Sequence, residues 1–174
     1  SIEIADSVAV IGTYAFKNCT GLSQVELPSG LTHVGKLAFY ECSNVLSVSI
    51  PGSVDSIGDY AFAGCKALKD VTITAEKVKY GPYVFTGCEA LKSFYVNASV
   101  LPEGMFYECK NLEQVTVGPD VNDIGEFAFR ESAVKTLEVK DGNKAYKAQT
   151  ANYVVSNDGK TLVAVAPTVT GTFT

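Results

Sequence analysis

The apolar residues of this chain follow a pattern that recurs from Ile2 to Val139. It is clearest from Ile57 to Ile73, where an Ile-Gly pair is followed by Ala-Phe, Cys, Leu and a Val-x-Ile alternation. A phenylalanine marks every copy, at spacings of 23 residues except for one of 21: Phe16, Phe39, Phe62, Phe85, Phe106 and Phe129. Such a period indicates an array of stacked repeats, because a single repeat cannot bury its own apolar face.

Three short pieces are predicted within each repeat. The Val-x-Ile/Leu alternation, as in Val48-Ser49-Ile50, predicts a half-buried strand, which Pro51 ends. A second extended piece ends at the Ile-Gly pair, whose glycine suits a tight turn with positive φ. The Tyr-Ala-Phe-x-x-Cys piece is too short for a long helix, and we expect a helical or 3₁₀ turn there.

The last part of the chain departs from the pattern. Residues 153–156 and 161–165 are β-prone and flank an Asp-Gly pair, which predicts a β-hairpin. We therefore divide the chain into a repeat array over residues 1–139 and a hairpin segment over residues 140–174. Residues 171–174 lead toward a further repeat strand. The chain enters the pattern at Ser1 without a signal peptide, as expected of a mature or excised piece of a longer array.

The recurring motif Ile-Gly-x-x-Ala-Phe-x-x-Cys-x-x-Leu-x-x-Val-x-Ile-Pro closely resembles the BspA-like leucine-rich repeat family over about residues 1–139. The resemblance implies an α/β repeat solenoid, a right-handed curved stack of about six repeats. It implies a parallel sheet on the concave side, and short strands and turns on the other. It also implies an extracellular or cell-surface location and, for some members, adhesion. It does not imply one shared ligand.

Stacking turns each repeat position into a column, and the phenylalanine column is expected in the core. The cysteines also share one position, where we expect buried thiols. Strands about 4.8 Å apart suit neither a disulfide, which needs Cβ atoms about 3.8 Å apart, nor a tetrahedral metal site. This column comprises Cys19, Cys42, Cys65, Cys88 and Cys109.

Strand residues between the inward ones are expected to face the concave surface, where they form either a solvated sheet face or a binding patch. Tyr95 is the one aromatic anchor on that surface. The patch predicted near the middle of the array is Asp70, Thr72, Ser93, Tyr95, Gln114 and Thr116. A column beside the Ala-Phe pairs is expected at the opposite edge, as a packing ladder or a second contact surface. Its members are Tyr14, Leu37, Tyr60, Tyr83, Gly104 and Phe127.

Composition and motifs argue against several functions. The formal net charge of −5 disfavours nucleic acid, and no apolar run has the length of a membrane span. His33 is the only histidine and has no Ser or Cys nucleophile beside it in its own repeat. Phosphate loops, dinucleotide fingerprints and short Cys-x-x-Cys pairs do not occur. We therefore expect no cofactor and no metal.

These observations favour a non-enzymatic extracellular recognition or adhesion module, which binds a host or bacterial surface protein or glycan through a solenoid face. The alternative is a structural spacer within a larger cell-surface protein. A third hypothesis is a hydrolase that uses paired surface acids, and a pocket with converging carboxylates would favour it.

Overall fold

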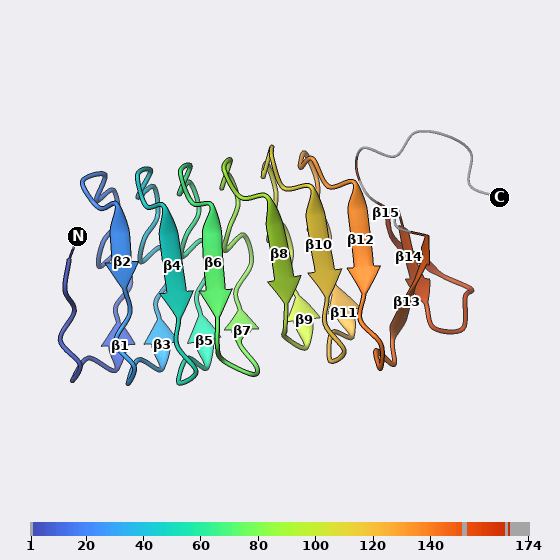
Figure 1. Cartoon of the computed structure of the whole chain (residues 1–174), viewed down its shortest axis with the longest axis horizontal. Helices are drawn as coiled ribbons and strands as arrows, with labels where there is room; N and C mark the ends of the chain where they lie inside the picture. The colour runs from blue at the N-terminus through green and yellow to red at the C-terminus, as the bar shows by residue number, and fades with distance from the viewer. Residues whose placement is uncertain (1, 151–152, 166, 168–174) are drawn as a thin grey trace.

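The chain forms a β-solenoid of six stacked repeats, each with one short and one long strand that run in opposite directions (Figure 1). The computed structural model describes residues 2–150, 153–165 and 167. The short strands are β1 (Val10–Ile11), β3 (His33–Val34), β5 (Ser56–Ile57), β7 (Lys79–Tyr80), β9 (Val100–Leu101) and β11 (Asp123–Ile124). The long strands are β2 (Gln24–Glu26), β4 (Ser47–Ile50), β6 (Asp70–Ile73), β8 (Ser93–Val96), β10 (Gln114–Val117) and β12 (Thr136–Val139).

Neighbouring strands pair in parallel, with partners one repeat apart. Ser47 pairs with Asp70 and Ser93 with Gln114, so the register follows the repeat length. Alternate residues of each long strand point inwards, as in β4, where Val48 is buried and Ser49 is exposed. The predicted solenoid with a parallel sheet is confirmed.

The phenylalanine column forms the centre of the core, as predicted. Its ring centroids follow one another at 5.0, 5.1, 5.7, 6.2 and 6.3 Å, and consecutive ring planes differ by 3–11°. Phe39, Phe62, Phe85 and Phe106 are fully buried. Parallel, offset rings add to the free energy of apolar burial, so this column binds each repeat to the next.

All five cysteines are free thiols, as predicted, and four of them are buried. The Cys42 thiol donates to the Phe16 carbonyl of the preceding repeat at 3.0 Å. Cys65, Cys88 and Cys109 repeat this bond at 3.1–3.3 Å. In the sixth repeat the hydroxyl of Ser132 occupies this place and donates to Phe129 of its own repeat at 2.6 Å. The thiol therefore supplies a weak donor between repeats as well as apolar volume.

The Tyr-Ala-Phe-x-x-Cys pieces are successive turns. The expected helical or 3₁₀ turn is wrong, since the described residues contain no helix. Positive φ interrupts any helical hydrogen-bond ladder and directs N–H groups toward the next repeat. Phe16 N donates to Ala38 O and Phe39 N to Ala61 O, both at 2.7 Å. Two columns have φ of 54–72°: Tyr14, Leu37, Tyr60, Tyr83, Gly104 and Phe127, and then Asn18, Glu41, Gly64, Gly87, Glu108 and Glu131.

The glycine after each Ile serves a different purpose from the predicted one. Gly35 and Gly58 do not have positive φ. A Cβ on Gly35 would lie 2.7 Å from the backbone of Gly12, and one on Gly58 would lie 2.6 Å from Lys36 N. The prediction of positive φ is therefore wrong, and glycine is needed because adjacent backbones touch at this point.

The strand side of the stack is interrupted, and Figure 1 shows the gap between β6 and β8. Strands β2, β4 and β6 form one sheet and β8, β10 and β12 another, while β7 and β9 also belong to different sheets. Phe94 of β8 takes an inward place that Val71 and Val115 take in the neighbouring repeats. Its ring is tilted between Phe85 and Phe106, with centroids 5.1 and 5.0 Å away.

The turn side remains continuous across the same interruption. Phe62 N donates to Val84 O at 3.0 Å and Phe85 N to Met105 O at 3.1 Å. The backbone bonds between turns therefore hold the repeats together where β6 and β8 do not pair.

An antiparallel sheet of β13 (Tyr146–Thr150), β14 (Tyr153–Ser156) and β15 (Leu162–Val165) follows the last repeat. The predicted hairpin is confirmed as β14 and β15, and β13 adds a strand that was not expected. The Tyr146 hydroxyl donates to Asn122 O at 2.8 Å and attaches this sheet to the sixth repeat. The strand expected at residues 171–174 lies outside the described residues, and the boundary at residue 139 stays a prediction.

Candidate binding surfaces

The outward residues of the long strands form what we call the long-strand face. All six residues of the predicted patch belong to it, and all are exposed except Thr116, which is half-buried. Tyr95 is 46% exposed, so its ring presents apolar area to solvent. A Cβ on Gly118 would lie 3.2 Å from the Tyr95 hydroxyl, which shows that the ring extends along the face toward β10 and the residues that follow it.

The structure brings together four of the six predicted residues. Ser93 pairs with Gln114 and Tyr95 with Thr116 across β8 and β10. Asp70 and Thr72 lie on β6, whose partner is β4 in the other sheet. The patch is therefore divided by the interruption of the sheet, which the exact repeat spacing gave no reason to expect.

Glu138 on β12 is a member of this face that the sequence analysis did not select. Its carboxylate accepts from Gln114 Nε2 at 3.0 Å and from the Thr116 hydroxyl at 3.4 Å. These bonds orient both polar side chains beside Tyr95. A hollow of about 380 Å³ also borders Glu138, between β12 and Ala148. In the sequence, the only sign of Glu138 is its repeat position: it occupies the position of Tyr95 and Thr116, one strand further along.

The turn face comprises the two positive-φ columns and the residues between them. Tyr60 and Tyr83 stack with their centroids 5.0 Å apart, and the Tyr83 hydroxyl donates to Glu103 at 2.6 Å. This hydrogen bond raises the pKa of Tyr83 to about 12. The column is thus a packing ladder at its centre, with Tyr14 and Phe127 52% and 45% exposed at its ends.

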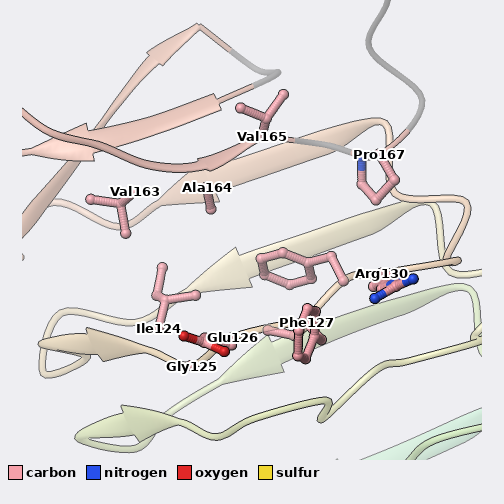
Figure 2. Close-up of a pocket in the computed structure, with 11 residues that line it drawn as sticks. Ile124, Gly125, Glu126, Phe127, Arg130, Val163, Ala164, Val165 and Pro167 are labelled. Carbon is pink, nitrogen blue, oxygen red and sulfur yellow. The ribbon is translucent and has the colours of Figure 1, made fainter.

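A hollow of about 320 Å³ lies at the end of the stack. Figure 2 shows Val163, Ala164 and Pro167 on one side of it and Ile124 and Phe127 on the other. The N–H groups of Phe127 and Phe129 have no acceptor among the residues that the structure describes. The corresponding groups of earlier repeats bond to the following repeat. Among the described residues, this hollow therefore lies where the last repeat has no following repeat to bond to.

One Ser–His contact forms between repeats. The ring of His33 and the hydroxyl of Ser56 lie 2.6 Å apart. Hydrolytic triads also place an acid behind the histidine, whereas the residue on the other side of His33 in this column is Val10. Among the described residues, no group of three or more His, Cys, Asp or Glu side chains is arranged to hold a metal ion. We therefore interpret the His33–Ser56 contact as part of the packing between repeats.

The buried cysteines are poor nucleophiles. Burial raises the pKa of Cys42 to about 11 and that of Cys109 to about 12, because the thiolate would lose its hydration. Burial also raises the pKa values of Cys65 and Cys88 well above the ordinary value of a thiol. Thiolate chemistry at neutral pH is disfavoured at these positions.

Comparison with known proteins identifies the repeats. The family model of the BspA type leucine-rich repeat region matches residues 1–102 and 38–154, with six copies. No curated protein matches the chain. No helix in the described part of the chain has the length and apolar character needed to cross a membrane.

Solved bacterial structures have the same fold. A leucine-rich repeat protein from Eubacterium ventriosum is 27% identical with a TM-score of 0.79, over 91% of this chain and 42% of that one. A leucine rich cell surface protein from Faecalibacterium prausnitzii is 26% identical with a TM-score of 0.63, over 87% and 48%. A leucine-rich repeat protein of T. pallidum, 22% identical with a TM-score of 0.57 over 79% and 74%, shows the fold alone. The chain spans less than half of the length of the first two.

Proposed function

The chain belongs to the BspA-type leucine-rich repeat proteins, and on that premise we propose that it is a non-enzymatic recognition module at a bacterial surface. The similarity to a leucine rich cell surface protein supports this location. Stacked repeats supply an extended face whose residues vary without affecting the core. The buried thiols and the single Ser–His contact favour recognition over catalysis.

The observation that carries this proposal is the exposed ring of Tyr95 within a polar, ordered sheet. Ser93, Gln114, Thr116 and Glu138 surround it with hydroxyl, amide and carboxylate groups. An aromatic ring with polar neighbours is typical of the centre of a protein-binding or glycan-binding surface. At the start of the same sheet, Lys135 donates to Glu113 at 2.8 Å, and this bond lowers the pKa of the Glu113 carboxyl. We therefore propose that the sheet of β8, β10 and β12 binds a host or bacterial surface protein or glycan.

A binding measurement tests the role of Tyr95. Candidate partners come from a glycan array and a panel of purified surface proteins, and surface plasmon resonance measures their affinity. Tyr95→Ala is expected to weaken binding by about 2 kcal/mol, roughly thirtyfold in Kd. Tyr95→Phe separates the contribution of the hydroxyl from that of the ring.

Tyr14→Ala is the matched control, because Tyr14 is similarly exposed but lies on the turn face. Loss of binding with Tyr14→Ala and none with Tyr95→Ala would move the site to the turn face. Absence of any protein or glycan partner would favour the spacer, in which the array only separates other parts of a longer protein.

A further inference from the structure

A groove of about 250 Å³ crosses the turn face at the third and fourth repeats. Its floor contains Ala63 and Gly64 of the third repeat and Thr86 and Gly87 of the fourth. Tyr40 and Glu41 of the second repeat border it on one side, and Glu108 of the fifth borders it on the other. The groove is separate from the long-strand face, so a binding site there does not depend on the function proposed above.

The groove exists because two consecutive repeats have small residues where the others have large ones. The position before the second positive φ is Lys17, Tyr40, Ala63, Thr86, Tyr107 and Arg130 along the array. The next position is Asn18, Glu41, Gly64, Gly87, Glu108 and Glu131. Non-glycine residues adopt the same φ in four of the six repeats, so this φ favours glycine at positions 64 and 87 without requiring it. A Cβ on Gly87 would make only ordinary contacts, at 3.8 Å, whereas one on Gly64 would lie 3.0 Å from Cγ of Glu41.

The sixth repeat shows what fills this space when the side chain is long. The guanidinium of Arg130 lies over the Phe127 ring, 5.2 Å from its centroid, and Arg130 Nε is 3.7 Å from the Glu131 carboxylate. In the first two repeats the Lys17 ammonium is 5.2 Å from the Tyr14 ring and 5.4 Å from the Tyr40 ring. The turn face therefore holds a cation against aromatic rings at both ends of the array, and at the Arg130 end an acidic group lies beside it.

The charges around the groove also favour a cation at its centre. Glu41, Glu89 and Glu108 line it together with one basic residue, Lys66, which pairs with Glu89 at 3.4 Å. Glu41 and Glu108 make no ion pair with a residue that the structure describes. Tyr60 also lines the groove together with Tyr40, and a hydrogen bond with Glu41 raises the pKa of the Tyr40 hydroxyl.

We propose that this groove binds an arginine side chain of a partner protein, held by the ring of Tyr40 and the carboxylates of Glu41 and Glu108. A guanidinium is planar, stacks on aromatic rings and has five N–H donors for two carboxylates. A neutral sugar would leave the two negative charges unbalanced. A lysine would neutralise charge but would stack less well on the ring.

Nuclear magnetic resonance titration of the whole chain tests the proposal, with N-acetyl-arginine methylamide as the probe and its neutral isostere N-acetyl-citrulline methylamide as the control. A single side chain should bind with a Kd on the order of 1 mM. Saturable shifts are expected at the amides of Gly64, Thr86 and Gly87. Citrulline should bind at least about tenfold more weakly, because it lacks the charge.

Three variants sharpen the test, and thermal unfolding by circular dichroism checks that each is folded. Thr86→Arg places a guanidinium where Arg130 stands in the sixth repeat and should abolish probe binding. Glu41→Gln combined with Glu108→Gln should weaken it at least about tenfold. Glu131→Gln, at the same repeat position but outside the groove, should leave it unchanged.

Equal binding of arginine and citrulline, shifts confined to other amides, or equal losses with Glu131→Gln would overturn the proposal. It would also be overturned by no saturable shift with the arginine probe, or by groove shifts with glucose or calcium chloride in its place.

Discussion

Phe62→Ala tests whether the phenylalanine column holds the repeats together. Phe62 is fully buried, and its ring stacks on Phe39 at 5.1 Å and on Phe85 at 5.7 Å. Truncating a buried phenylalanine to alanine destabilises a protein by about 3–5 kcal/mol, through lost burial and the cavity left behind. With a ring on each side, Phe62 should lie in the upper part of this range, near about 4–5 kcal/mol.

Phe129→Ala provides the comparison. Phe129 is 6% exposed and, within the described part of the chain, stacks on one ring only, that of Phe106 at 6.3 Å. Loss of one stacking partner is worth about 0.5–1.5 kcal/mol beyond burial, so this substitution should destabilise by about 3 kcal/mol. Phe62→Leu retains most of the apolar volume without the ring and should destabilise by about 1–1.5 kcal/mol.

Urea unfolding followed by far-UV circular dichroism measures the free energies. The slopes with denaturant are compared first, because a changed slope means that the amount of surface exposed on unfolding has changed. An equal loss for Phe62→Ala and Phe129→Ala, or a larger one for Phe129→Ala, would refute the nearest-neighbour reasoning. A loss below about 2 kcal/mol for Phe62→Ala would show that the core collapses around the gap.

Three further predictions concern buried polar groups. The buried Tyr80 hydroxyl has no hydrogen-bond partner among the residues that the structure describes, so Tyr80→Phe should raise the free energy of unfolding by about 1 kcal/mol in the same urea assay; a loss of stability would show that the hydroxyl is satisfied. Cys19 is half-buried whereas the other four cysteines are buried, so a thiol reagent should modify Cys19 first and the others only on unfolding, as followed by mass spectrometry. Burial raises the thiol pKa from 9.0 to about 11 at Cys42 and to about 12 at Cys109, so these thiols lose their protons at a lower pH in the unfolded chain than in the folded one. The protonated thiols should therefore contribute fully to the free energy of unfolding below about pH 9, and this free energy should fall as the pH rises toward 11.

Much of the core was predictable because the chain repeats itself. A residue such as Phe62 stacks on copies of its own position, so the contacts of one repeat follow from its own sequence. The same logic placed Cys65 inside and Tyr95 outside. It failed for the turns, because the spacing of Tyr60 and Phe62 suits a helical turn as well as a chain with positive φ at Tyr60. The hydrogen bonds that decide between them run between repeats and have no local signal.

The candidate surfaces show a similar division. Tyr95, Gln114 and Thr116 were recognised from their column, but their separation from Asp70 comes from the interruption between β6 and β8, which no single repeat indicates. Glu138 joined the surface only through hydrogen bonds that reach across from β12.

The sequence by itself determined the period, the inward columns and the free thiols of this protein, because every repeat meets a near-copy of itself. Tertiary structure alone decided the interruption of the sheet and the acidic groove at Gly64 and Gly87. Both depend on residues that meet across several repeats. A hollow forms where two small residues become neighbours in space between larger ones, and strand pairing stops between β6 and β8 although every repeat has a long strand.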